Sequence, residues 1–203
     1  MRLGILGGTF NPIHLGHLVV AECAREQCAL DQIRFIPTAT PPHKAPRDLL
    51  DGAKRLALIR LAIRGHPSFR ASDLELELGG ISYTIRTVRL LHARYPRARL
   101  FLIVGSDMLQ VPWVGLPALR RLCTFVVAPR RFDFSHHPSN RPEHRRRIGR
   151  DRLRRLPRMQ RLVMPQVAIS SSMIRARIRR GQSIRYLVPD AVARSIVHRR
   201  LYR

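Results

Sequence analysis

The chain has 203 residues, 45% of them hydrophobic, which is enough to bury a sizeable core in one domain. Its apolar stretches fall well short of the roughly 18–20 residues that a membrane-spanning helix requires. The formal net charge is +25, and only two of the 38 basic residues are lysines. Such an excess of positive charge favours anionic ligands. It also keeps a nucleic-acid partner open, although no helix-turn-helix, zinc-finger or aromatic RNA-binding signature accompanies it.

Two features of the sequence bear on the cellular compartment of the protein. Met1 leads straight into an apolar run, without the charged region and cleavage site of a signal peptide. The three cysteines, Cys23, Cys28 and Cys123, are odd in number and lie in apolar periodic segments. We expect buried thiols of a cytoplasmic protein, and neither a disulfide nor a metal set.

Short apolar runs alternate with helical periodicities along the chain. In chain order the pattern predicts a strand at 3–6, a helix at 18–29, a strand at 33–36, a proline-rich loop at 38–47, a helix at 51–64, an extended piece within 69–78, a helix at 83–95, a strand at 99–104, a helix at 116–122, a strand at 124–128, a strand at 162–164, a helix at 172–180 and a final helix at 189–201. This alternation predicts an α/β fold: a Rossmann-like doubly wound parallel sheet with helices on both faces.

We expect residues 1–203 to form a single domain with a small C-terminal helical part at about 170–203. A basic variable insertion at about 131–160 interrupts it. Residues 130–161 hold twelve arginines and three acids. A solvated surface insertion is the default reading, and an RNA-binding tract or a subunit contact stays open.

The run GGTFNPIHLGH at 7–17 is the most informative segment. It follows an apolar strand and precedes an apolar helix. A glycine turn before a helix N-terminus binds phosphate, because free backbone N–H groups and the helix dipole point at the anion. His14 and His17 add donors that can follow charge on a reacting phosphate. The alternatives are ordinary histidines beside a tight turn, or a metal site, for which no third ligand is visible.

A second motif, ISSSMIR at 169–175, stands near the other end of the chain. A serine before an apolar run is a helix N-cap. Three consecutive serines exceed what a cap needs, and Arg175 lies one turn into the helix. This segment therefore offers hydroxyls, N–H groups and a guanidinium to a second set of phosphate oxygens.

Together these motifs resemble the nucleotidyltransferase superfamily that carries an (H/T)-x-G-H site and an ISS(S/T)xxR site. Within it, the chain is similar to the bacterial nicotinate-nucleotide adenylyltransferases almost from end to end. The matching pieces are GGTFNPIHLGH at 7–17, PPHK at 41–44, SYT at 82–84, VGSD at 104–107, Trp113, FVVAPR at 125–130, ISSSMIR at 169–175 and YLVP at 186–189. Asn11, Arg86 and Ser106 depart from the usual pattern.

The resemblance implies transfer of AMP from ATP to nicotinate mononucleotide, giving nicotinate adenine dinucleotide and pyrophosphate, a step of NAD biosynthesis. The implied partners are those two substrates, with no membrane and no specific nucleic acid, and self-association stays open. Mg²⁺ is implied as a counter-ion of ATP, held through its phosphates, with no metal ligands on the protein.

The resemblance also assigns site residues. The catalytic residues are His14, His17, Lys44 and Arg175. ATP is bound by Gly8, Thr9, Phe10, His14, His17, Gly105, Asp107, Ile169, Ser171, Ser172 and Arg175. Nicotinate mononucleotide is bound by Lys44, Tyr83, Thr84, Trp113 and Arg130. For Trp113 and Tyr83, packing in the core is the competing reading.

Other functions stay open on the sequence. One is a different small-molecule nucleotidyltransferase, such as a phosphopantetheine adenylyltransferase. An aminoacyl-tRNA synthetase fragment is disfavoured, because the chain has no room for an anticodon domain. A basic nucleic-acid-binding protein is the alternative from another class, and salt-dependent RNA binding without pyrophosphate release would support it.

Overall fold

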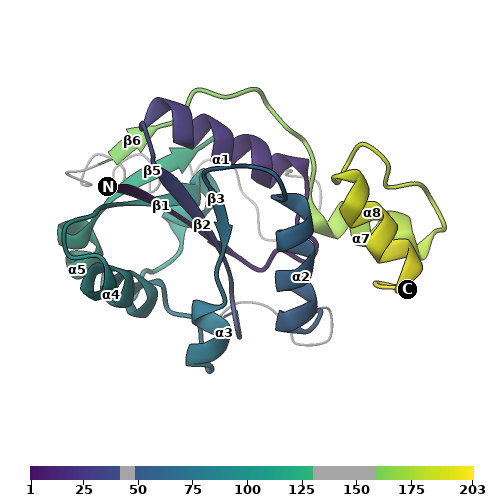
Figure 1. Cartoon of the computed structure of the whole chain (residues 1–203), viewed down its shortest axis with the longest axis horizontal. Helices are drawn as coiled ribbons and strands as arrows, with labels where there is room; N and C mark the ends of the chain where they lie inside the picture. The colour runs from purple at the N-terminus through teal and green to yellow at the C-terminus, as the bar shows by residue number, and fades with distance from the viewer. Residues whose placement is uncertain (42–48, 130–158) are drawn as a thin grey trace.

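The computed structural model describes residues 1–41, 49–129 and 159–203. Within these ranges six strands form one parallel sheet in the order β3-β2-β1-β4-β5-β6, which confirms the predicted Rossmann-like fold (Figure 1). The strands are β1 (Arg2–Gly8), β2 (Gln32–Pro37), β3 (Phe69–Ala71), β4 (Arg99–Gly105), β5 (Cys123–Ala128) and β6 (Met159–Arg161).

The strand order changes direction between β1 and β4, the two central neighbours. Gly8 pairs with Pro37 at the end of β2, and Gly105 pairs with Ala128 at the end of β5. The carboxyl ends of these strands therefore form one edge. Ligands of doubly wound sheets bind beyond that edge, at the point where the strand order reverses.

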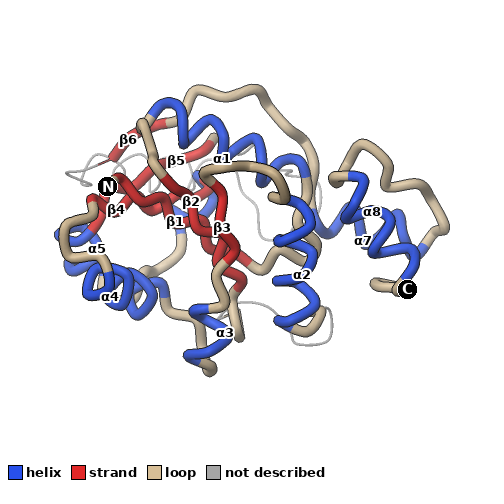
Figure 2. Tube along the Cα trace, in the orientation of Figure 1, coloured by secondary structure: helices blue, strands red, loops and turns tan. Residues whose placement is uncertain are grey.

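Helices cover both faces of the sheet (Figure 2). They are α1 (Leu15–Gln27), α2 (Gly52–Ala62), α3 (Leu74–Leu78), α4 (Thr84–Arg94), the 3-10 helix η2 (Ser106–Gln110), α5 (Leu116–Leu122), α7 (Ser171–Arg179) and α8 (Asp190–His198). In the part of the chain described here, none of them is long and apolar enough to cross a membrane.

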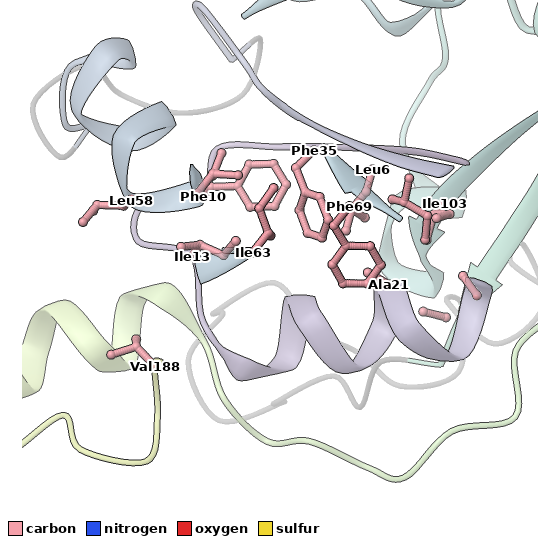
Figure 3. Close-up of a cluster of buried hydrophobic side chains, with 14 of the residues drawn as sticks. Leu6, Phe10, Ile13, Ala21, Phe35, Leu58, Ile63, Phe69, Ile103 and Val188 are labelled. Atoms are coloured by element: carbon pink, nitrogen blue, oxygen red, sulfur yellow. The ribbon is translucent and has the colours of Figure 1, made fainter. Parts of the chain in front are cut away.

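The side chains of β1 divide between two buried clusters, because successive residues of a strand face opposite sides. Leu6 joins the cluster beneath α1 and α2, whereas Leu3 and Ile5 join the cluster beneath α4 and α5. Figure 3 shows the first cluster, in which Phe10 and Phe35 pack side by side. Each fully buried side chain of this size stabilises the fold by about 1.5–3 kcal/mol.

The C-terminal helices share this first cluster. Ile174 of α7 and Val192 of α8 are fully buried in it together with Phe10 and Ile13. The Leu15 backbone N–H also donates to the Leu187 carbonyl at 3.0 Å. In Figure 1 the two helices lie beside α2 and near the start of α1. Residues 171–203 are thereby packed against the turn that follows β1.

The extended piece predicted within 69–78 is present as the three-residue strand β3. The helix α3 that follows it was missed, because five residues of alternating leucine and glutamate fit one helical turn as well as a strand. Other predicted boundaries were wrong. The last strand is Met159–Arg161, ahead of the predicted 162–164. The first helix begins at Leu15, three residues early, because His14 is its N-cap.

The cysteine prediction holds in part. All three thiols are free, and Cys28 and Cys123 are buried, but Cys23 is half-exposed. Burial raises the pKa of the Cys123 thiol to about 12, so it stays protonated and unreactive at neutral pH. The proline-rich loop lies partly, and the basic insertion lies mostly, outside the described residues.

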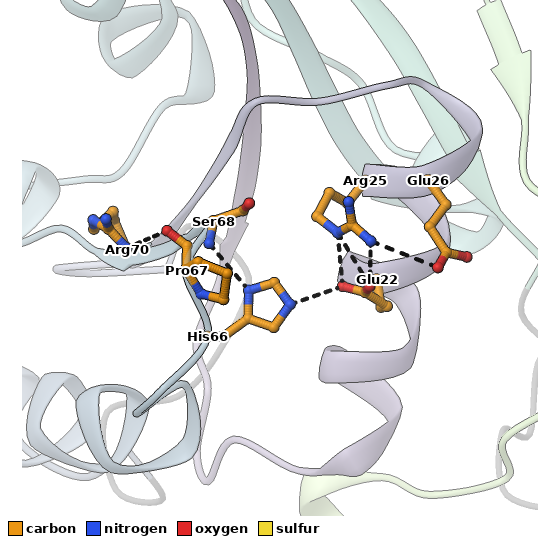
Figure 4. Close-up of polar contacts among 7 residues, drawn as sticks. All are labelled: Glu22, Arg25, Glu26, His66, Pro67, Ser68 and Arg70. Carbon is orange, nitrogen blue, oxygen red and sulfur yellow. Dashed lines mark hydrogen bonds and ion pairs between the residues drawn. The ribbon is translucent and has the colours of Figure 1, made fainter.

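A polar cluster ties α1 to the loop before β3 (Figure 4). The His66 Nε2 lies 3.1 Å from a Glu22 carboxylate oxygen, and Arg25 pairs with the same carboxylate at 2.6 Å. An open groove of about 570 Å³ lies here, between α1 and residues 62–69. None of the predicted site residues that the structure describes lines it.

Candidate active site

The turn after β1 places both histidines at the start of α1. His14 is the N-cap, and its backbone N–H donates to the His17 Nδ1 at 3.2 Å. Because Nδ1 accepts this bond, a neutral His17 ring carries its proton on Nε2. His17 is half-exposed, whereas His14 is 3% exposed. His17 is therefore the more accessible donor at this helix N-terminus.

Packing fixes the two imidazoles relative to each other. Their ring centroids are 3.8 Å apart with an interplanar angle of 34°, and the Phe10 ring centroid lies 5.0 Å from that of His17. Gly16 makes room for this arrangement, because a Cβ there would lie 3.0 Å from two atoms of the His14 ring. The need for space beside the His14 ring thus explains why a glycine stands at position 16.

The start of α7 reaches the same turn. The Ser171 hydroxyl donates to the Pro12 carbonyl at 2.8 Å, and the Arg175 Nη1 donates to the Asn11 carbonyl at 2.9 Å. The two motifs, which both supply residues to the predicted ATP site, are therefore in contact in the structure. This contact joins segments about 160 positions apart at one edge of the sheet.

The three serines have different contacts. Ser170 is the N-cap of α7, since its hydroxyl accepts from the Met173 backbone N–H at 3.1 Å. Ser171 holds the Pro12 carbonyl, so its hydroxyl proton is already engaged. Ser172 is exposed, with its hydroxyl 3.5 Å from the Arg175 Nη2. Ser172 is accordingly the serine that is exposed to solvent, whereas the Arg175 Nε is buried and has no hydrogen-bond partner among the described residues.

The other ATP-side residues lie at neighbouring strand ends. Gly105 closes β4, and Asp107 follows in η2. Thr9 lies in the turn after β1, just beyond Gly8 at the end of that strand. Ile169 is half-buried against the first cluster, one residue before the cap of α7.

Two of the residues predicted to bind nicotinate mononucleotide, Tyr83 and Thr84, lie next to a contact with the loop after β2. The Ala39 backbone N–H donates to the Ser82 hydroxyl at 2.9 Å, and the Ser82 N–H donates to the Thr40 carbonyl at 3.0 Å. Tyr83 is the N-cap of α4 and Thr84 its first residue. Two hydrogen bonds thus attach Ser82, just before α4, to residues 39 and 40 of the loop after β2.

Trp113 combines packing with partial exposure. Its ring meets Phe125 edge-on at 5.7 Å, and its Nε1 donates to the Met108 carbonyl at 2.8 Å. It packs against the second buried cluster while remaining half-exposed. Both readings of Trp113 therefore have support. Lys44 and Arg130, predicted at the same end of the site, lie outside the described residues.

Sequence reasoning missed Arg55. This α2 residue is 1% exposed, and its guanidinium donates to the carbonyls of Leu50, Thr9 and Thr38. A signal was present, because Arg55 lies on the apolar stripe of its helix, four residues before Ile59. A charged residue on such a stripe marks a buried polar contact.

Tyr202, the last residue but one, was not among the predicted site residues. It packs against the first cluster, with a buried hydroxyl that has no hydrogen-bond partner among the described residues. Burial raises the pKa of this hydroxyl, and the charges of Arg175 and Arg55 partly oppose the shift. The C-terminus therefore lies near both guanidinium groups.

The site is rich in donors. Imidazoles, a guanidinium, hydroxyls and a helix N-terminus are ligands for anions. Within residues 1–41, 49–129 and 159–203 there is no group of three His, Cys, Asp or Glu side chains arranged to hold a metal ion.

Comparison with known proteins decides the family. The cytidylyltransferase-like family model matches residues 5–177. A probable nicotinate-nucleotide adenylyltransferase of Desulfitobacterium hafniense is 39% identical, covering 100% of this chain and 96% of the relative. Another from a Synechococcus strain is 43% identical, covering 99% of this chain and 94% of the relative. The chain belongs to the nicotinate-nucleotide adenylyltransferase family. The predicted family and enzyme class are therefore confirmed.

Solved structures agree on the fold of this adenylyltransferase. The nicotinic acid mononucleotide adenylyltransferase of Plasmodium falciparum, complexed with NaAD, superposes with a TM-score of 0.78 at 18% identity, covering 99% of this chain and 97% of that one. A putative nicotinate-nucleotide adenylyltransferase of Vibrio parahaemolyticus gives 0.69 at 20% identity, covering 100% and 96%. At these identities the likeness concerns the fold.

Proposed function

We propose that the edge formed by the β1 turn and the start of α7 transfers AMP from ATP to nicotinate mononucleotide. The observation that carries this proposal is the convergence of His17, Ser172 and Arg175 on one helix-terminated turn. Hydrogen bonds of Ser171 and Arg175 to the carbonyls of Pro12 and Asn11 maintain that convergence. Membership of the nicotinate-nucleotide adenylyltransferase family indicates that the acceptor is nicotinate mononucleotide.

The reaction is an in-line displacement at the α-phosphorus. A phosphate oxygen of nicotinate mononucleotide forms a bond to that phosphorus, and the bond between it and the oxygen of the β-phosphate breaks. Pyrophosphate leaves with the electron pair. The attacking oxygen is already ionised at neutral pH, so the protein needs no strong base. Positioning and neutralisation of charge account for most of the rate.

We assign the triphosphate to the donors of the turn and of α7. His17, through its Nε2 proton, faces the α-phosphate, where charge builds on the leaving oxygen. The His14 ring packs against the His17 ring. Arg175 and Ser172 hold the β- and γ-phosphates. Ser171 acts by fixing the Pro12 carbonyl, and its backbone N–H is available to the anion. The backbone at Gly8, Thr9 and Phe10 completes this side.

The adenosine and the acceptor occupy the neighbouring strand ends. Gly105 and Asp107, at the end of β4, receive the ribose hydroxyls, and Ile169 lies beside them. Thr84, Tyr83 and Trp113 receive the nicotinate ring and its carboxylate. Lys44 is assigned to bridge the two reacting anions, and Arg130 to contact the acceptor phosphate.

Mg²⁺ belongs to this proposal as the counter-ion of the triphosphate. The donors present suit anions, so we assign the ion to phosphate oxygens and water. When bound, it neutralises charge on the phosphates. A cytoplasmic location and self-association stay predictions from the sequence, as does the single domain with its basic insertion.

A pyrophosphate-release assay tests the function. The full chain is supplied with ATP and Mg²⁺ and, in turn, with nicotinate mononucleotide, nicotinamide mononucleotide and phosphopantetheine. We expect fastest release with the nicotinate compound and nicotinate adenine dinucleotide as product. Fastest release with phosphopantetheine would reassign the acceptor. Release with none of the three, together with salt-dependent RNA binding, would overturn the proposal.

A further inference from the structure

Arg55 lies beneath the site and joins three of its loops. Its Nη1 donates to the Thr9 carbonyl at 2.9 Å and its Nη2 to the Thr38 carbonyl at 2.7 Å. The Nε donates to the Leu50 carbonyl at 2.7 Å. Thr9 follows β1, Thr38 follows β2, and Leu50 precedes α2. One planar guanidinium thus sets the spacing of the loops that end both strands.

The bond to Thr9 has a directional consequence. In a trans peptide the carbonyl and the following N–H point in opposite directions. The only cis peptide bond among the described residues is Asn11–Pro12, so the Thr9–Phe10 bond is trans. With the Thr9 carbonyl held on Arg55, the Phe10 N–H points to the opposite side. The proposed function assigns the Phe10 N–H to the triphosphate, so the bond from Arg55 would fix the orientation of that donor.

The bond to Thr38 links the turn to the acceptor side. The Thr38 backbone N–H donates to the Gly8 carbonyl at 2.9 Å, so the two strand ends are joined twice. The next residue, Ala39, is held by Ser82, which precedes Tyr83 and Thr84. Arg55 therefore lies on a continuous path of hydrogen bonds from the triphosphate turn to the start of α4.

Arg55 also places a buried cation beneath an anion site. No carboxylate of the described residues forms a salt bridge with it, and its side chain is bonded to carbonyl oxygens alone. The three carbonyls accept from the guanidinium without neutralising its charge. Burial lowers the pKa of Arg55, and the charges of Tyr202 and Asp51 partly oppose that shift. In the proposed complex the triphosphate adds further negative charge.

We propose that Arg55 is a positioning residue for adenylyl transfer, which fixes the Thr9–Phe10 peptide for the triphosphate and aligns the two strand-end loops that hold the reacting substrates. The inference rests on the proposed function, because it presupposes ATP at the β1 turn. Arg55 acts through the backbone and does not touch the reacting atoms.

Two variants separate position from charge. Arg55→Lys keeps the charge but loses the fork that reaches two carbonyls. Arg55→Ala leaves a cavity that guanidinium ion fits. We expect Arg55→Lys to lower kcat by about 10- to 100-fold, since small displacements of reacting groups have effects of that size. Low millimolar guanidinium chloride should restore part of the kcat of Arg55→Ala, whereas urea at the same concentration should not.

Arg60 supplies the matched control. It lies on the same helix, is exposed, and has only a long contact with Asp73 at 3.8 Å. Arg60→Ala should keep wild-type kcat and show no response to guanidinium. Circular dichroism at the assay temperature confirms that each variant is folded. If Arg55→Lys proves unfolded, the guanidinium response of Arg55→Ala and its affinity for inorganic triphosphate decide the question.

Each outcome has one reading. Loss of kcat in folded Arg55→Lys, with rescue of Arg55→Ala by guanidinium, supports the positioning role. Unchanged kcat in folded Arg55→Lys, or equal responses to guanidinium and urea, overturns it. Absence of pyrophosphate release by the wild-type enzyme would instead overturn the proposed function, so the two failures are distinguishable.

Discussion

The Arg175 Nη1 donates to the Asn11 backbone carbonyl at 2.9 Å, although the two residues are 164 positions apart. This bond, together with that from Ser171 to Pro12, attaches the start of α7 to the turn after β1. Two helix N-termini, those of α1 and α7, thereby meet at one edge of the sheet. Their dipoles and free N–H groups favour the same anion.

Replacing Ser171 by alanine should reduce catalysis more than stability. The variant loses the bond that holds the Pro12 carbonyl, which is worth about 0.5–1.5 kcal/mol. We expect kcat/KM for ATP to fall by about 10-fold, because a displacement at the turn acts on every phosphate contact. Ser170→Ala is the control: losing that cap lowers the melting temperature, while kcat/KM changes less. The reverse order would remove Ser171 from the site.

His17→Ala should abolish most turnover. The variant removes one preorganised donor at the α-phosphate, and such losses raise the barrier by roughly 3–4 kcal/mol. Steady-state pyrophosphate release and thermal unfolding measure the two effects separately. His66→Ala is the control, since His66 pairs with Glu22 in the cluster beside the groove and should keep its activity. Near-wild-type turnover in His17→Ala would contradict the assigned role.

Gly16→Ala should separate activity from stability. Alanine favours a helix over glycine by about 1 kcal/mol, so the fold should not weaken much. The new Cβ would lie 3.0 Å from the His14 ring, which must then move. We expect kcat to fall with an almost unchanged melting temperature. The opposite pattern is expected for Gly181→Ala, where φ is +66° and space is open. Unchanged kcat in Gly16→Ala would show that the ring position is unimportant.

Trp113 variants test the acceptor end. Trp113→Phe keeps an aromatic ring against Phe125 but loses the Nε1 bond to the Met108 carbonyl. Trp113→Ala loses both. We expect Trp113→Ala to raise the KM for nicotinate mononucleotide more than the KM for ATP, with Trp113→Phe in between. Equal changes in both KM values would point to packing alone.

Glu75 predicts a dependence of stability on pH. Its side chain is buried, and burial raises the pKa of the carboxyl above the usual 4.5, although the Thr87 hydroxyl donates to it at 2.6 Å. A raised pKa means that the neutral form suits the folded state. The protonated Glu75 carboxyl therefore contributes stability that is fully present below pH 4.5. This contribution is lost as the pH rises through the folded-state pKa.

Glu75→Gln should therefore stabilise the protein at pH 8 and change little at pH 4. Chemical unfolding at the two pH values measures the difference. Glu77→Gln, an exposed neighbour, should show no such difference. An equal effect of Glu75→Gln at both pH values would contradict a raised pKa.

Much of this architecture could be predicted from the sequence, because it depends on local patterns. Gly7 and Gly8 predict a turn close behind the first strand, although β1 itself runs through Gly8. Alternating strands and helices of these lengths give a parallel sheet. The meeting of the turn after β1 with the start of α7 follows from that topology, since strand ends and helix starts share one edge.

Other parts depend on contacts that no local pattern specifies. The Ser171 hydroxyl was expected at phosphate, but in the structure it donates to Pro12, a partner fixed only by tertiary packing. The three bonds of Arg55 join carbonyls from separate loops, so its helical position indicated burial but no partners. The short α3 reads equally well as a strand, because its stability comes from contacts such as that between Glu75 and Thr87.

A crystal structure of the full chain with a non-hydrolysable ATP analogue tests the central claim most directly. We predict one triphosphate with its oxygens within hydrogen-bonding distance of both the His17 imidazole and the Arg175 guanidinium. A triphosphate that contacts only one of these two groups, or that binds in the groove between α1 and residues 62–69, would contradict the account.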